Sequence, residues 1–114
     1  METLNKSLMG GSTALMVMHL LSEKDMYGYE IVSELEKRSE NFFSLKEGTL
    51  YPVLHGLEKD GYATSYNELA ETGKQRKYYT LTKKGISALE QKKAEWKRYS
   101  RGVNTVIGEP SYAK

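Results

Sequence analysis

The chain has 114 residues, of which 39% are hydrophobic and 28% charged, a composition typical of one small domain with a modest core. It contains no cysteine, which excludes disulfide scaffolds, thiolate zinc sites and thiol nucleophiles. The longest apolar stretch, residues 14–21, is interrupted by His19 and is shorter than the roughly 20 residues of a membrane span. The N-terminal residues lack the pattern of a secretory signal, so we expect a soluble, cytoplasmic protein.

The formal net charge is only +2, but the charges are unevenly distributed. Residues 1–45 carry seven acidic and four basic side chains, whereas residues 74–84 carry five basic side chains and no acidic one. Basic groups interleaved with tyrosines suit a phosphate or nucleic-acid partner. The alternative interpretation of the second segment is a basic surface that faces only water.

Apolar residues at helical spacing predict three helices, over residues 5–22, 27–40 and 46–59. Two glycines in the middle of the first helix predict a kink or a closely passing backbone. Asp25 is the expected N-cap of the second helix. The helices are expected to share a core made of Leu15, Met16, Leu20, Ile31, Leu35, Leu50, Leu54 and Leu57.

The third helix carries two positional signals. Pro52 lies inside it and removes a backbone hydrogen bond, so we expect its first turn to be loosened or bent. Gly61 follows its last residue, where a left-handed cap is expected.

After Gly61 the pattern changes to β-branched and aromatic residues. Residues 62–67 and 75–81 are separated by a polar loop, which predicts a β-hairpin. From strand alternation we expect Tyr78 and Leu81 to point away from Tyr79, so that one tyrosine packs on the core and the other faces outward.

A last helix is predicted over residues 83–107, with Thr82 as its N-cap and residues 108–114 as a tail. Leu89, Trp96 and Val103 recur every seven residues, which is the spacing of a helix seam. Nothing is left in the chain to cover this seam, so it predicts a homodimer.

These elements predict a mainly α, α+β fold. Three helices followed by a basic hairpin have the layout of a winged helix-turn-helix, over residues 1–82, with the last helix as a dimerisation element. One α-helix fits the major groove of DNA, which is about 12 Å wide, and the hairpin reaches the adjacent backbone or minor groove.

Three motifs resemble the PadR family of bacterial transcriptional regulators: YGYEI at 27–31, GTLYP at 48–52 and RKYYxLTxKG at 76–85. The resemblance covers roughly residues 8–100 and extends to the short subgroup, which has a single C-terminal helix. It implies a homodimeric repressor whose last helix packs on the first helix of its partner. It also implies, for some members, release of DNA when a small aromatic molecule binds. Gly56 departs from the pattern, because many members carry a basic residue there.

The candidate DNA-binding residues are the polar positions of the third helix and the basic positions of the hairpin. Hydroxyls can donate to phosphates or base edges, and lysine and arginine neutralise phosphates. They are Lys46, Thr49, Tyr51, His55, Lys59, Lys74, Arg76 and Lys77. Tyr51 has a second interpretation, as a residue packed over the core. The expected operator is a pseudo-palindrome with half-sites roughly 34–36 Å apart, or a multiple of that spacing.

The single tryptophan, Trp96, lies near the middle of the seam, where a two-fold axis would bring two indoles together. Two facing indoles can sandwich a flat aromatic ligand. The expected ligand-binding residues are Trp96, Leu8, Gly11, Leu15, Leu89, Lys93 and Ser100. The expected dimer interface consists of Leu4, Leu8, Leu89, Trp96, Tyr99, Val103 and Val106.

No catalytic motif, metal-ligand set or cofactor loop is evident in the sequence, so we expect neither an enzyme nor a bound cofactor or metal. Of the two histidines, His19 is expected in the core or an interface. His55 shares a side of its helix with Glu58, but the sequence offers no second pair of ligands to complete a metal site. The alternative function is a winged-helix module for protein interaction or ligand sensing with weak DNA affinity, which the third helix, poor in cations, leaves open.

Overall fold

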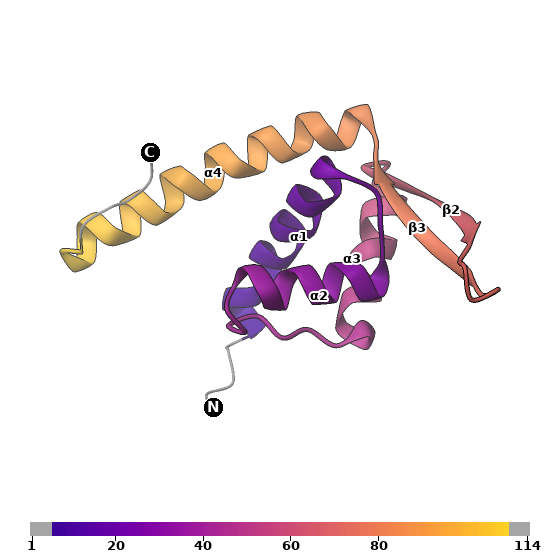
Figure 1. Ribbon diagram of the computed structural model, residues 1–114. Helices are drawn as coiled ribbons and strands as arrows, with labels where there is room; N and C mark the ends of the chain where they lie inside the picture. Colours follow the sequence, from indigo (N-terminus) through magenta and orange to yellow (C-terminus); the bar gives the residue numbers. More distant parts are fainter. Residues whose placement is uncertain (1–5, 110–114) are drawn as a thin grey trace.

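The computed structural model describes residues 6–109, with side chains from residue 11 onward, as four helices and a three-stranded antiparallel sheet (Figure 1). The helices are α1 (Lys6–Glu23), α2 (Gly28–Arg38), α3 (Glu47–Lys59) and α4 (Lys83–Ile107). The strands are β1 (Met26–Tyr27), β2 (Ala63–Leu69) and β3 (Gln75–Leu81), in the order β1-β3-β2. This is the winged helix-turn-helix fold that the sequence predicts, with the last helix appended.

The core lies between the first three helices and the inner face of the sheet. Its fully buried members include Ile31, Leu50 and Leu54, as predicted. The face that α1 turns to the core differs from the prediction, because Val17, Met18 and Leu21 are buried there while Leu15 and Met16 are only partly buried. Leu20, Leu35 and Leu57 are buried as expected, and Met26, Leu45, Ala63, Tyr79 and Leu89 complete the core from outside the three helices.

The start of α2 differs from the prediction. Met26 and Tyr27 form the short strand β1, which pairs with β3, so Tyr27 rather than Asp25 is the residue at the N-cap. The Tyr27 N–H donates to the Glu30 side chain at 3.3 Å, which satisfies one free donor of the helix start. Asp25 instead accepts a hydrogen bond from the Tyr66 hydroxyl of β2 at 2.7 Å. A two-residue strand gives no periodic signal, which is why its pairing was not foreseen.

The C-terminus of α3 has the left-handed cap that the sequence predicts. Gly61 has φ of +78°, and the N–H groups of Gly61 and Tyr62 donate to the carbonyls of Glu58 and Leu57. This double hydrogen bond closes the helix and turns the chain into β2.

The hairpin forms as predicted, and its inner face carries Tyr79, which is fully buried. Tyr78 is on the other face, as expected for one inward and one outward tyrosine. The placement of Leu81 with Tyr78 is wrong: residues two apart share a face of a strand, and Leu81 packs against the core as Tyr79 does.

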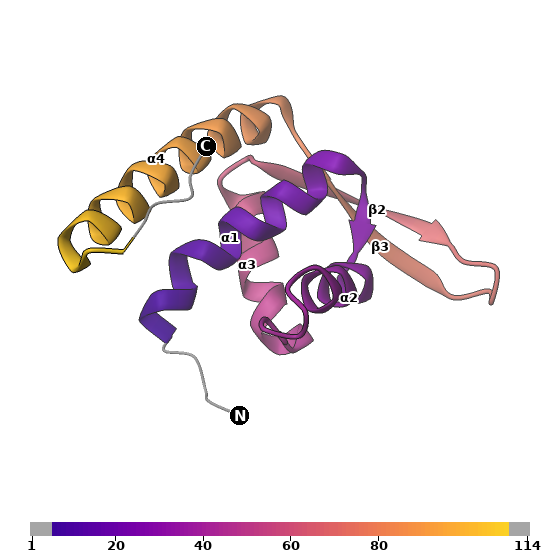
Figure 2. The same ribbon diagram turned by 60° about the vertical axis from the view of Figure 1, so that its left-hand side comes forward.

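The start of α4 is fixed against the end of α3. The Thr82 hydroxyl accepts from the Gly85 N–H at 3.0 Å, as predicted for an N-cap, and donates to the Gly61 carbonyl at 2.7 Å. The Lys84 ammonium donates to the Asp60 carbonyl at 2.9 Å. Gly85 leaves room for the Tyr62 carbonyl oxygen, which a Cβ at this position would overlap. Figure 1 shows α4 running away from α1 toward its C-terminal end, and in both views α4 extends past α1 (Figures 1 and 2).

Candidate nucleic-acid interface

The solvent-facing side of α3, together with its N-cap residue, carries four of the eight predicted DNA-binding residues. Leu50, Leu54 and Leu57 anchor the opposite side in the core. This orientation leaves Lys46, Thr49, His55 and Lys59 exposed. A helix held on its apolar side with a free polar side is the arrangement that major-groove insertion requires.

Tyr51 occupies a different position from these four residues. It is half-buried, and its hydroxyl oxygen lies 2.9 Å from where a Cβ on Gly28 would be. Its ring centroid is 6.1 Å from that of His55. Tyr51 therefore packs at the junction of α2 and α3, in line with its second interpretation, and Gly28 provides the space for its hydroxyl.

The hairpin forms a cationic wing beside α3, to which it is tied by a 3.0 Å hydrogen bond from the Ser65 hydroxyl to Glu58. Lys74 lies at the exposed turn, next to Gly73, whose φ of +87° requires glycine or strain. Arg76 and Lys77 occupy opposite faces of β3, because successive side chains of a strand alternate. The sequence identifies all three cations as candidates for DNA contact. It does not indicate that Arg76 and Lys77 point in opposite directions.

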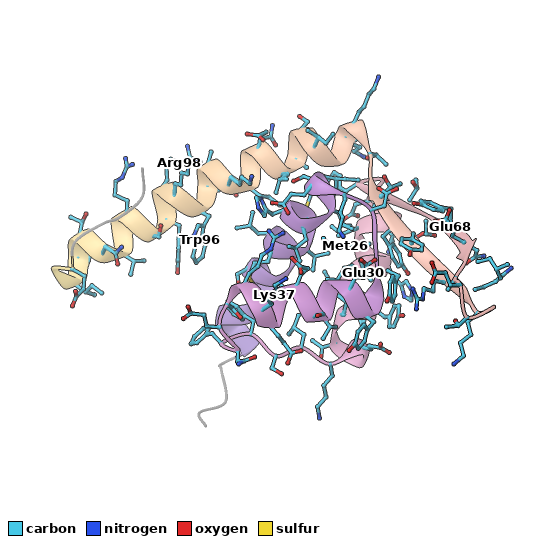
Figure 3. The ribbon with its side chains drawn as sticks, viewed as in Figure 1. Met26, Glu30, Lys37, Glu68, Trp96 and Arg98 are labelled. Carbon is cyan, nitrogen blue, oxygen red and sulfur yellow. The ribbon has the colours of Figure 1, made fainter. Side chains whose placement is uncertain are left out.

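The predicted ligand-binding residues are only partly brought together. Leu15, Lys93 and Trp96 line one groove of about 340 Å³ between α1, α2 and α4. Trp96 lies on the side of α4 that faces α1 and α2 (Figure 3). The remaining lining residues are Met16, His19, Leu20, Glu34, Leu35, Arg38, Ser39, Phe43 and Lys97.

The other expected ligand-binding residues lie elsewhere. Leu89 is buried in the core, so its side chain is removed from both the groove and the expected dimer surface. Ser100 donates to the Trp96 carbonyl at 2.8 Å and does not line the groove, and Gly11 lies outside it on α1. Leu4 lies outside the described residues, as does the side chain of Leu8.

Sequence reasoning missed the α2 residues of the groove, Glu34 and Arg38, because charged residues of an amphipathic helix are typical of its solvent-facing side. Arg38 binds Glu23 through both terminal nitrogens and Glu34 at 3.0 Å. These hydrogen bonds raise the pKa of Arg38, and the bond from Arg38 lowers the pKa of Glu23. The charge of Arg38 is therefore balanced, whereas Lys93 and Lys97 have no carboxylate partner within residues 6–109. The α4 side of the groove is positive.

The distal half of α4 exposes an apolar face. Tyr99 is 67% exposed, Val106 is 86% exposed, and Trp96 and Val103 are each more than 40% exposed. The Trp96 and Tyr99 rings stack with centroids 6.3 Å apart. Contiguous apolar surface of this kind is typical of an interaction site.

Within the part of the chain that the structure describes, no group of three or more metal-ligating side chains could hold an ion. No described helix combines the length and apolarity that crossing a membrane would need.

Comparison with known proteins gives a consistent answer. The model of the family described as "Transcriptional regulator PadR-like family" matches residues 17–91. An uncharacterized protein of Lysinibacillus sphaericus is 41% identical over 80 residues, which cover 70% of this chain and 73% of that protein. The negative transcriptional regulator PadR of Bacillus subtilis is 32% identical over 73 residues, 64% of this chain and 40% of that protein.

Among solved structures, a transcriptional regulator from Clostridium thermocellum superimposes with a TM-score of 0.81. It is 34% identical in sequence, and the match covers 90% of this chain and 97% of that one. The resemblance noted in the sequence motifs is thus confirmed over most of the chain. This protein belongs to the PadR-like family of transcriptional regulators.

Proposed function

We propose that this protein is a homodimeric repressor that inserts α3 into the major groove of an operator and places the wing on the adjacent backbone. The exposed side of α3 beside a wing that carries Lys74, Arg76 and Lys77 is the observation that carries the proposal. The cations of α3 lie only near its two ends, at Lys46 and Lys59, so most of the phosphate attraction comes from the wing. The relative named as a negative regulator supports repression as the direction of control.

The proposed dimer forms through the distal half of α4. In a monomer Trp96, Tyr99, Val103 and Val106 would remain in water, and burying a side chain of this size stabilises an assembly by about 1.5–3 kcal/mol. A two-fold pair of reading helices fits a pseudo-palindromic operator with half-sites about 34–36 Å apart or a multiple of that distance.

The proposed effector is a small planar aromatic molecule bound against Trp96. The groove combines an indole wall and aliphatic side chains with Lys93 and Lys97, a combination that suits an aromatic acid. Binding there relieves repression in this proposal. Because Trp96 is the single tryptophan, its fluorescence reports occupancy directly. Unchanged fluorescence across a panel of planar acids and cations would refute the effector.

DNA binding is tested by a gel shift on the region upstream of the protein's own coding sequence at two salt concentrations. Replacing Arg76 and Lys77 by alanine should weaken binding to all sequences alike. It should also flatten the dependence of log K on log salt by about 0.9 for each lost phosphate contact.

The matched control removes two cations from distal α4, through Arg98→Ala and Arg101→Ala, and should leave the slope unchanged. An unchanged slope in the wing variant would contradict wing contact. Salt-independent or absent binding by the wild type would favour a protein-interaction or ligand-sensing module.

A further inference from the structure

A row of three tyrosine rings crosses the outer face of the sheet. Tyr27 of β1 and Tyr66 of β2 both lie directly opposite Tyr78 of β3, and directly opposed residues project to the same face. The centroid of the Tyr78 ring lies 5.4 Å from that of Tyr27 in an edge contact and 5.7 Å from that of Tyr66 in a stacked contact. Because Tyr79 is buried, this row faces away from the core.

Both ends of the row are held by polar groups. At one end the Tyr66 hydroxyl donates to Asp25 Oδ2 at 2.7 Å, which ties β2 to the segment just before β1. At the other end the guanidinium carbon of Arg76 lies 4.5 Å from the centroid of the Tyr27 ring. The three rings therefore form a continuous row of contacts between the Asp25 carboxylate and the Arg76 guanidinium.

Arg76 is half-buried although it lies in the part of β3 beyond its pairing with β1. Glu68 is its cross-strand neighbour, yet in residues 6–109 no carboxylate forms an ion pair with Arg76 (Figure 3 labels Glu68). A guanidinium whose flat side lies on an aromatic ring keeps the N–H groups along its edge free. Such an edge can contact a phosphate through two parallel hydrogen bonds.

The other two wing cations are held differently. Lys74 lies exposed at the turn, and the Lys77 ammonium lies 5.6 Å from the centroid of the Tyr79 ring, on the opposite face from Arg76. An ammonium on a flexible stem acts as a point charge without a preferred plane. Of these three cations, only Arg76 has a planar group, and that group lies over an aromatic ring.

We propose that Tyr27 is a positioning residue for DNA binding, whose ring holds the Arg76 guanidinium ready for a two-point contact with a backbone phosphate. Tyr78, Tyr66 and Asp25 hold that ring in place. Ordering a long side chain before binding lowers the entropic cost of association, so the row contributes to affinity without touching DNA. This inference rests on the proposed DNA-binding function.

The test measures fluorescence anisotropy of a labelled duplex from upstream of the protein's own coding sequence, with an unrelated duplex of equal length, over a salt series. Tyr27→Leu should lower affinity about 3- to 10-fold, the range expected for a lost cation–π contact. It should also flatten the salt slope by about 0.9, as the loss of one phosphate contact does. Tyr27→Phe keeps the ring and should match the wild type in both respects. Phe42→Leu is the control, since Phe42 is an exposed aromatic residue whose ring contacts Phe43 and not the tyrosine row.

A double-mutant cycle separates positioning from general structural support. Tyr27→Leu should cost nothing further in an Arg76→Ala background, because the contact that it positions is already absent. If Tyr27→Leu does not fold, Arg76→Lys provides the test: the charge remains but the planar edge is lost, so most of the loss seen in Arg76→Ala should appear.

The outcomes distinguish the two proposals. If Arg76→Ala weakens binding while Tyr27→Leu keeps wild-type affinity and slope, positioning is refuted and DNA binding stands. Wild-type affinity in Arg76→Lys would likewise refute the oriented two-point contact. Wild-type protein that binds neither duplex would overturn the proposed function and this inference with it.

Discussion

The body of the molecule (residues 6–89) and the distal half of α4 (residues 96–107) differ in whether the apolar side of their helices is covered. In the body, Leu89 and Tyr79 are buried by contacts within one chain. About two to three turns further along α4 than Leu89, Trp96 and Tyr99 continue the same apolar spacing but remain exposed. An apolar stripe along a helix thus indicates that this side of the helix is buried. It does not indicate whether the same chain or a second chain covers it.

Leu89→Ala should give the largest effect and should act on the body. Removing a buried leucine side chain leaves a cavity and typically costs 2–5 kcal/mol of unfolding free energy. Chemical denaturation followed by circular dichroism measures this cost. The adjacent exposed substitution Glu90→Ala is the control. A cost below about 1 kcal/mol for Leu89→Ala would mean that the proximal part of α4 does not belong to the body's core.

The paired substitution Val103→Lys and Val106→Lys should act on assembly. Lysine ammonium groups on the seam would have to be desolvated against their two-fold copies, so we expect the solution mass to fall from that of a dimer to that of a monomer. Light scattering gives the mass, and circular dichroism should show retained helix.

Thr105→Lys is the control for this pair, since it adds a charge to the same turn but off the seam. A pair variant that stays dimeric at micromolar concentration would place the interface elsewhere.

Thr82→Ala should have a smaller effect, at the joint between the two regions. It removes the cap of α4 and the donor to the Gly61 carbonyl, and loss of a threonine N-cap costs about 1 kcal/mol. Thr82→Ser keeps the hydroxyl and should recover most of the stability in the same denaturation measurement. Equal stabilities of the alanine and serine variants would show that the hydroxyl is not needed.

The smallest expected effect is a pH dependence of the body above neutrality. The hydrogen bond to Asp25 raises the pKa of Tyr66 from 10.0 to about 12. A group with a raised pKa in the folded state stabilises fully below its unfolded pKa, and this contribution is lost as pH rises from about 10 to about 12. Unfolding curves of the wild type and Tyr66→Phe should therefore converge over that interval. A difference that stays constant across it would contradict the contribution of this hydrogen bond.

Some parts of the candidate site could be predicted from the sequence and others could not, and the difference has a physical reason. The polar side of α3 and the cations of the wing follow from periodicity and composition, which are local properties. The tyrosine row depends on the pairing of Tyr27 with Tyr78 through a two-residue strand, and the groove depends on Arg38 of α2 lying near Trp96 of α4. Both are contacts between segments distant in sequence.

Local sequence features predict the order of the four helices and the hairpin, the bounds of α3 and α4 to within a residue, the Gly61 and Thr82 caps and the family, but not strand β1. Each of these follows from short-range rules: helical spacing, capping chemistry and a contiguous motif. Contacts between distant segments set which side of α1 is buried, that Asp25 binds Tyr66 instead of capping α2, and that Leu89 belongs to the core. These outcomes depend on which side chains from distant parts of the chain pack together, and no local sequence pattern specifies those contacts.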